Sequence, residues 1–413
     1  MAIDGNRNWF SIFRFVFGVL IMFGVSRFWY YNWIEELYII PSFHFRFPGL
    51  DFIRILPGWL MHGLFIVMFG CGLAIAGNVY YRPACLLFFI AFTYIELIDV
   101  TYYLNHYYLV SLLSFTMIFY DSKQSADTIY NQQVLSFLKL QISIVYFFGG
   151  INKIGYDWLV KAEPLKIWLY ANSNLPLLGK LLADEKTAYV AAWLSMLFDV
   201  SVAFMLWFHK TRVAAYIMLS VFHILTALLF NIGIFPWVMM TGALLFFSRA
   251  VPLRKLFSIQ PNQPRAKLAI AVLSCVAVWQ LLFPMRHFLR SENYLWTERG
   301  FRFSWNIMLM EKNGTIEFAA RDTSGKLEDV NEQSMLTPFQ LKMMSTQPDL
   351  ILQFAHHIQK ANEEKGKKIQ AVFADAQVSL NGRSATTYFG PEINLLNRKD
   401  ELYKSIIAHT PAR

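Results

Sequence analysis

The sequence has few charged residues for its length. Of its 413 residues only 16% are Asp, Glu, Lys or Arg, whereas soluble domains usually carry about a quarter. Hydrophobic residues make up 56% of the chain, and the charged residues are crowded into the termini, the loops and the last third. This composition excludes a single soluble globular domain and leaves apolar runs that are long enough to cross a membrane.

Cysteine and metal-binding motifs are also scarce. The three cysteines, Cys71, Cys85 and Cys275, lie inside apolar runs, where a thiol is typically a small buried group and not part of a disulfide framework. The nine histidines include no H-x-x-x-H or H-E-x-x-H spacing. Because no acid-rich cluster accompanies them either, we predict no metal site.

A basic stripe of the kind that binds nucleic acid is missing too. The formal net charge is +9, but the basic residues are spread over short loops and are not interleaved with aromatic residues. We therefore expect no nucleic-acid partner and interpret these residues as signals of membrane topology. The N-terminus lacks the short core and small-residue cleavage site of a signal peptide, so we expect the first apolar run to remain as a span.

Long apolar runs dominate the first 287 residues. About 20 such residues cross the hydrocarbon core once, which predicts nine spans near 9–26, 57–77, 83–103, 104–120, 134–152, 189–208, 212–230, 232–248 and 267–285. The loops richest in Lys and Arg then lie on the same side as the N-terminus, and the positive-inside rule places that side in the cytoplasm. The tail after residue 286 is therefore expected outside the cytoplasm.

The composition becomes that of a soluble domain after residue 288. Residues 301–310, 314–322, 369–380 and 384–389 have the pattern of strands, and Asn381-Gly382 is a hairpin signal between the last two. A helix is predicted from a cap at Ser345 or Thr346 to Gly366. The predicted fold is thus a polytopic α-helical membrane protein of about nine transmembrane helices, residues 1–287, followed by a small extracytoplasmic α+β domain, residues 288–413.

Ionisable and polar side chains inside spans are costly, so each is a candidate functional residue. Each also has a simpler explanation. Lys153 can lift its ammonium to the interface, Asn105 and His106 can cap a helix or join an aromatic belt, His223 can hydrogen-bond between helices, and His287 can anchor the last span.

The predicted topology brings these residues to one depth. Asn105 and His106 begin a span at the outer side, Lys153 and His287 end two others there, and His223 lies about two turns below. If each of these residues were an independent anchor, nothing would require all of them to lie in the same leaflet. Withdrawal from water disfavours the charged form of a lysine, and a neutral amine is a general base. The residues predict a membrane-embedded acid/base site at the outer side. Candidate acid partners for its nitrogen bases are Glu96, Asp99 and Asp199.

Four stretches carry a resemblance to a known family: "YFFGGINKIGYDW" (146–158), "NHYYLVSLLSFTMIFYD" (105–121), "FHILTALLFNIGIFPWVMM" (222–240) and "HFLRSENYLWTERGFRFSW" (287–305). In order and spacing they resemble the vitamin K-dependent γ-glutamyl carboxylases, whose membrane part is the HTTM domain. The resemblance implies an enzyme in which O2 converts a reduced naphthoquinone to its epoxide. The strong base formed removes a γ-proton from a peptide glutamate, and the carbanion captures CO2.

The resemblance also implies roles for individual residues. The family's hydroquinone-deprotonating lysine falls on Lys153, and the lysine that precedes it in animal enzymes is Asn152 here. The implied catalytic residues are Lys153, His106, Asn105, His223 and His287. The implied quinone-binding residues are Asn105, His106, Lys153, Phe148, Gly149, Gly150 and Phe235, where paired glycines allow close approach of a flat ligand.

Partners and location follow from the same resemblance. The cofactor is reduced vitamin K or menaquinone with O2 and CO2 as co-substrates, and the partners are a glutamate-containing protein or peptide and the lipid bilayer. Animal members carry a disulfide and a C-terminal extension without counterpart in this sequence, which favours the bacterial branch and an inner-membrane location. Two alternatives remain open: a quinone-binding oxidoreductase without carboxylation, and a non-enzymatic membrane scaffold.

Overall fold

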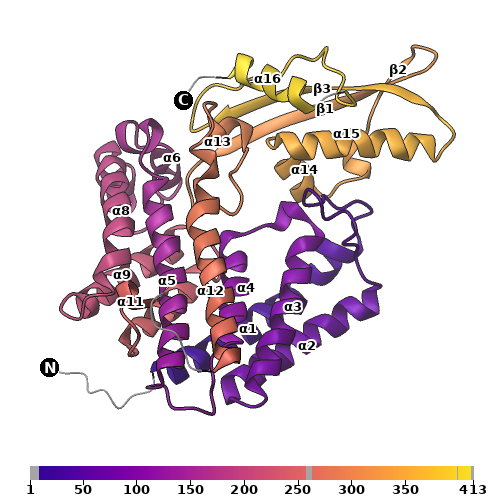
Figure 1. The fold of residues 1–413 in the computed structure, drawn as a ribbon. Coiled ribbons are helices and arrows are strands. Elements are labelled where there is room, and N and C mark those ends of the chain that lie inside the picture. Colours follow the sequence, from indigo (N-terminus) through magenta and orange to yellow (C-terminus); the bar gives the residue numbers. More distant parts are fainter. Residues whose placement is uncertain (1–8, 257–262, 398, 411–413) are drawn as a thin grey trace.

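The computed structural model describes residues 9–256, 263–397 and 399–410. A bundle of long helices forms one part, and a sheet with flanking helices is seated on one end of that bundle (Figure 1). We call this end of the bundle the outer end and the opposite end the inner end. The two parts correspond to the membrane portion and the α+β domain expected from the sequence.

Seven helices in the described part of the chain are long and apolar enough to cross a membrane. They are α1 (Trp9–Tyr30), α2 (Gly58–Gly77), α3 (Tyr81–Ile98), α5 (Ile129–Ile151), α8 (Glu185–Met205), α9 (Arg212–Leu229) and α12 (Pro264–Leu282), which continues as η5 (Phe283–His287). The segments expected at 104–120 and 232–248 form the shorter helices α4 (Asn105–Met117) and α10 (Phe235–Ala243), the latter extended by η4 (Leu244–Phe247). All nine expected apolar segments are therefore helical, but two are too short to span by length alone.

Helix α5 is the centre of the bundle. In its most apolar window 78% of the residues are buried, twice the next highest share, 39% in α3. The other long helices keep exposed apolar faces, as helices in contact with lipid do. Short elements join the helices: η1 (Glu35–Ile39), η2 (Val100–Tyr102), η3 (Tyr156–Val160), α6 (Leu165–Tyr170), α7 (Gly179–Leu182), α11 (Leu253–Leu256) and α13 (Tyr294–Thr297).

The C-terminal domain is built on an antiparallel sheet of strand order β2-β1-β3-β4. Its strands are β1 (Lys312–Asp322), β2 (Leu327–Asp329), β3 (Ile369–Leu380) and β4 (Thr386–Thr387), and its helical elements are η6 (Glu332–Ser334), α14 (Pro338–Met344), α15 (Pro348–Glu363) and α16 (Lys399–His409). The predicted helix is confirmed as α15, with Pro348 in its first turn. The predicted cap is wrong, because the N-cap is Gln347 and not Ser345 or Thr346, and the helix ends at Glu363, before Gly366. The strands predicted at 314–322 and 369–380 are confirmed as β1 and β3.

The strand predicted at residues 301–310 is wrong. The segment is made of turns, and Phe303, Trp305 and Met308 have φ values of 61°, 57° and 48°, which an extended strand does not contain. The strand predicted at 384–389 shortens to Thr386–Thr387. The Asn381-Gly382 turn is present with φ values of 50° and 72°, although β3 and β4 pair only at two positions beyond it.

This turn docks the C-terminal domain onto the membrane helices. Asp157, in the segment that follows α5, accepts hydrogen bonds from Arg383 Nη2 at 2.6 Å, Arg383 Nη1 at 2.8 Å and Asn381 Nδ2 at 2.9 Å. Burial raises the pKa of the Asp157 carboxyl, but these donors outweigh it and leave the pKa lowered. The Asp157 carboxylate thus anchors the C-terminal domain to the membrane helices.

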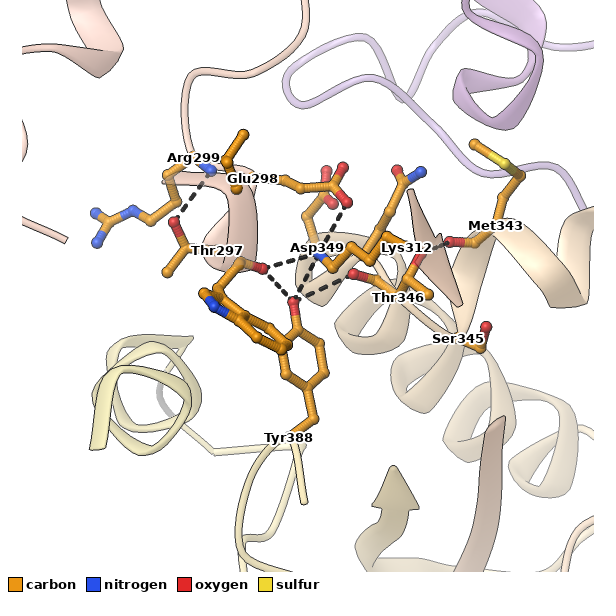
Figure 2. A network of polar contacts seen from close by, with 12 residues as sticks. Thr297, Glu298, Arg299, Lys312, Met343, Ser345, Thr346, Asp349 and Tyr388 are labelled. Carbon is orange, nitrogen blue, oxygen red and sulfur yellow. Dashed lines mark hydrogen bonds and ion pairs between the residues drawn. The ribbon is translucent and has the colours of Figure 1, made fainter. Parts of the chain in front are cut away.

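A buried ion pair anchors the chain where it enters the sheet. Lys312 Nζ lies 2.9 Å from Glu298 Oε1 and donates to Trp296 O at 2.9 Å and to the Tyr388 hydroxyl at 3.2 Å (Figure 2). That hydroxyl has both Trp296 O and Thr346 O within hydrogen-bond distance as acceptors for its single proton. The Lys312 and Glu298 side chains are 3% and 6% exposed. Burial lowers the pKa of Lys312, while Glu298 opposes that effect.

Candidate functional site

Lys153 follows the C-cap residue of α5, Asn152, and is buried. Its ammonium donates to Asp199 Oδ2 at 2.6 Å and to the Gly149 carbonyl at 3.0 Å, and it lies 5.4 Å from the centre of the Trp158 ring. Asp199 belongs to the middle of α8 and is 6% exposed. A charge in apolar surroundings requires such a partner, so the lysine does not simply reach for the interface.

The paired glycines have different surroundings. A Cβ at Gly150 would lie 2.6 Å from Val200 Cγ2 and 2.8 Å from Val200 N, so only glycine lets α5 approach α8 this closely. A Cβ at Gly149 would make ordinary contacts, 3.8 Å from Ile307 Cδ1 and 3.9 Å from Asp199 Oδ2. The geometry therefore assigns Gly150 to helix packing that sets the position of Asp199, and it leaves Gly149 beside the ammonium.

Substitution of these neighbouring glycines tests that assignment. Gly150→Ala is expected to cost about 1–3 kcal/mol through overpacking and to separate Lys153 from Asp199. Gly149→Ala is the matched control, because the same methyl group fits and alanine favours a helix by about 1 kcal/mol. Thermal unfolding of the purified protein measures both. Equal midpoints for the two variants would contradict the close approach at Gly150.

His223, in α9, is the second polar group at this level. A hydrogen bond of 2.6 Å joins its Nε2 to the Tyr146 hydroxyl of α5. When the tyrosine donates, His223 Nδ1 carries the ring proton. Nδ1 is buried and has no hydrogen-bond partner in the described part of the chain, which leaves a donor for a ligand.

Lys153 and His223 meet at a cavity of about 730 Å³ between α5, α8, α9 and α10. Gly149 and Phe235 also line it, and aromatic and aliphatic side chains form the rest of its wall, among them Trp158, Trp168, Phe198, Phe230, Ile307 and Met308. The volume is in the range of small-molecule sites, which are typically apolar with a few placed polar groups. The cavity thus suits a flat, lipophilic ligand.

His106 and Asn105 lie next to this cavity but not in its wall. The His106 and His223 rings each have their centre 5.8 Å from that of Phe235. Asn105 Nδ2 donates to the Asn306 carbonyl at 3.0 Å, just before Ile307 enters the cavity wall. One residue therefore lies between each of them and the cavity: Phe235 for His106, and Asn306 for Asn105.

The segment 300–308, in which Ser304, Trp305 and Asn306 are buried, is held by the outer ends of the helices. Asn152 Nδ2 donates to the Ser304 carbonyl at 2.8 Å, as Asn105 does to Asn306. Tyr103 accepts a hydrogen bond from Phe303 N at 2.9 Å. Irregular backbone at membrane depth is tolerated where protein groups satisfy it, and here it closes one side of the cavity.

The remaining predicted residues lie apart from the cavity. His287 is fully buried at the end of α12, with its ring centre 4.4 Å from that of Tyr294. Phe148 faces the main core, where its ring contacts Phe147. Glu96 accepts from Ser111 Oγ at 2.5 Å, and Asp99 accepts from Gln340 Nε2 at 2.9 Å. Among the candidate acids, only Asp199 contacts Lys153.

Sequence reasoning missed Tyr146, Trp158 and the role of segment 300–308. Tyr146 had a detectable signal, because it precedes Lys153 by seven residues, about two helical turns, and so shares its face. The pairing of Lys153 with Asp199 carried no local signal. Within the described residues, no group of three His, Cys, Asp or Glu side chains is arranged to hold a metal ion.

Comparison with known families covers most of the chain. The family model of the HTTM domain matches residues 4–250. The family model of the vitamin K-dependent gamma-carboxylase lumenal domain matches residues 265–407. No solved structure matches the chain. The two matches follow each other in the same order as the membrane helices and the outer sheet.

Proposed function

Because the chain belongs to the vitamin K-dependent γ-glutamyl carboxylase family, we propose that it converts peptide glutamate to γ-carboxyglutamate, coupled to epoxidation of a reduced naphthoquinone by O2. The observation that carries this proposal is the buried Lys153–Asp199 pair, which opens with His223 onto an apolar cavity of about 730 Å³. Once Lys153 has lost its proton, its amine beside this apolar cavity is the base that deprotonation of a lipophilic hydroxyl group requires.

The cavity fits reduced vitamin K or menaquinone. Its wall is apolar and aromatic, and the unpaired Nδ1 of His223 offers a hydrogen bond to an oxygen of the ring. When bound with O2, the reduced naphthoquinone would supply the strong base that removes the glutamate γ-proton before CO2 adds. Lys153, His223, Gly149 and Phe235 would hold this group. No metal takes part in the proposed reaction.

The protein's own residues move and hold protons. In its neutral form, Lys153 Nζ can take a proton from a phenolic hydroxyl, and Asp199 Oδ2 at 2.6 Å stabilises the ammonium that results. Tyr146 fixes the orientation of the His223 ring. The apolar wall excludes water, which strengthens these interactions and protects a reactive base.

In this proposal the other predicted residues act from outside the cavity wall. His106 would act on the ligand across Phe235, and Asn105 would position Ile307 by holding the Asn306 carbonyl. The proposed role of His287 is to position the segment that follows α12. Phe148 and Gly150 would contribute through packing around the site.

The protein is an integral membrane protein with its C-terminal domain outside the cytoplasm, as its helices and the match to a lumenal domain indicate. We further propose that a glutamate-containing peptide reaches the site from that side. Menaquinol as the natural quinone and a bacterial inner membrane are part of the same proposal. They rest on the resemblance to the bacterial branch of the family.

An assay on the full chain tests the proposal. Purified protein in lipid nanodiscs receives reduced menaquinone or reduced vitamin K, O2, ¹³C-bicarbonate and a glutamate-rich peptide, and mass spectrometry follows peptide and quinone. We expect a carboxylated peptide and the quinone epoxide, and neither product with the oxidised quinone. Epoxide alone would support a quinol oxygenase instead. Absence of both products with either reduced quinone would overturn the proposed activity.

A further inference from the structure

A second large cavity lies at the inner end of the bundle, far from the outer domain. Its volume is about 890 Å³, and it is formed by the start of α1, the first turns of α5, the connection from α8 to α9, and the chain between η4 and α11. Figure 1 places α11 on the side of the bundle away from the sheet. The proposed carboxylation makes no use of this cavity.

The cavity is strongly basic. Among the described residues that line the cavity there is no carboxylate, and the basic side chains in its wall are Lys139, His209, Arg212, Arg249 and Arg254. Arg249 does have an acidic neighbour, since its Nη1 lies 3.7 Å from Asp127 Oδ1, but both side chains are exposed. An ion pair at that exposure stabilises little, so the cavity keeps an excess of positive charge.

Lys139 is the most buried of the basic side chains that line this cavity. The residue is 3% exposed, and its ammonium donates to the Ser248 carbonyl at 2.7 Å and lies 5.9 Å from the ring centres of Trp207 and Phe246. An ammonium has three donors, and burying it without a counter-ion is costly. An anion in the cavity would offset that cost.

Two more donor groups belong to residues that line the cavity. Ser248 Oγ is buried and has no hydrogen-bond partner within the described ranges. Arg212 donates Nε to Leu206 O at 3.0 Å and Nη2 to Trp207 O at 3.2 Å, which engages two of the five N–H groups of a guanidinium. Ammonium, hydroxyl and guanidinium together match the oxygens of a phosphate group.

The rim of the cavity indicates what carries that phosphate. Phe208, Val213 and Leu253 line the cavity and are 64%, 45% and 41% exposed. Exposed apolar side chains at the end of membrane helices contact acyl chains. The ligand therefore combines an anionic head with a hydrocarbon part. We propose that this cavity binds the phosphate of an anionic phospholipid of the inner leaflet, as basic pockets between membrane helices do.

Native mass spectrometry of the full chain in detergent tests this site. The protein is titrated with phosphatidylglycerol, phosphatidylcholine and sn-glycerol 3-phosphate. We expect phosphatidylglycerol to bind at least about tenfold more tightly than either other ligand, and Lys139→Met to weaken it by about tenfold, the loss of one charge-assisted hydrogen bond. Ser248→Ala removes only an unpaired hydroxyl, so it should weaken binding a few-fold without changing the thermal midpoint.

The matched control is Lys123→Met, which removes an exposed inner-side lysine that does not line the cavity. It should bind phosphatidylglycerol like the wild type. Equal affinity of Lys139→Met and Lys123→Met would overturn the proposal. Glycerol phosphate binding as tightly as phosphatidylglycerol would also overturn it, in favour of a soluble phosphate compound. Neither result depends on whether the protein carboxylates glutamate.

Discussion

Lys153→Met protein is expected to lose the proposed carboxylation activity by a factor of about 10²–10⁴, the usual contribution of a positioned general base. The physical reason is that Lys153 is the titratable amine in the outer cavity, and methionine has similar length but no basic nitrogen. Carboxylated peptide and quinone epoxide, both measured by mass spectrometry, should fall together because one deprotonation precedes both. Lys161→Met is the control, since Lys161 is an exposed lysine of the same outer segment and lies outside the cavity.

A change in folding must be separated from this loss of activity. Lys153→Met leaves Asp199 as a buried carboxylate without its partner at 2.6 Å, which costs about 3–5 kcal/mol. The double variant Lys153→Met/Asp199→Asn removes that carboxylate, so its thermal midpoint should return toward that of the wild type while activity stays low. A double variant that regained carboxylation would show that the lysine serves only the packing of α5 against α8.

Lys312→Met is expected to destabilise the C-terminal domain by about 3–5 kcal/mol, because it leaves Glu298 buried and unpaired. The carboxylate is 6% exposed and lies among the groups of Figure 2, which hold Trp296 and Tyr388 together. Limited proteolysis of the domain as a function of temperature measures the effect. Lys326→Met is the matched control: Lys326 pairs with Glu328 at the surface, with side chains 68% and 42% exposed, and such pairs contribute little.

A second variant distinguishes the ion pair from simple loss of packing. Lys312→Met/Glu298→Gln removes both charges and should recover most of the stability, since a neutral pair of similar volume needs no counter-ion. Lys312→Met protein as resistant as Lys326→Met protein would refute a buried pair. Carboxylation is expected to fall with the domain's stability, because the chain from Glu298 leads directly into Ile307 and Met308, which line the outer cavity.

Part of the fold was accessible from local sequence patterns. Helix α15 was predicted because Pro348 and Gly366 mark its two ends and its apolar residues recur at helical spacing. Residues 301–310 misled the same reasoning, because apolar and polar residues alternate there as they do in a strand. In the structure their backbone finds hydrogen-bond partners in Tyr103, Asn105 and Asn152 at helix ends instead of in a neighbouring strand.

The candidate site, too, could be predicted only in part from the sequence. Lys153 and His223 could be selected because polar groups in apolar runs are costly wherever the chain folds, and both line the outer cavity. Asp199 was only one of three candidate acids that the sequence offered for the site, and Tyr146 was not named as the partner of His223. Lys153 pairs with a residue 46 positions away and His223 with one 77 positions away, and such contacts depend on which helix faces meet. The sequence alone also left Gly149 and Gly150 equivalent.

By itself the sequence determined the apolar helices, the position of the outer domain along the chain, and which polar residues lie inside apolar segments. It could do so because the length of an apolar run and the cost of burying a charge are local properties. The tertiary structure decided that Asp199 is the counter-ion of Lys153, that Asp157 anchors the outer domain, and that Lys139 lies in a basic inner cavity. The physical reason is that partners of buried charges are chosen by helix packing, and close packing is a property of the whole bundle.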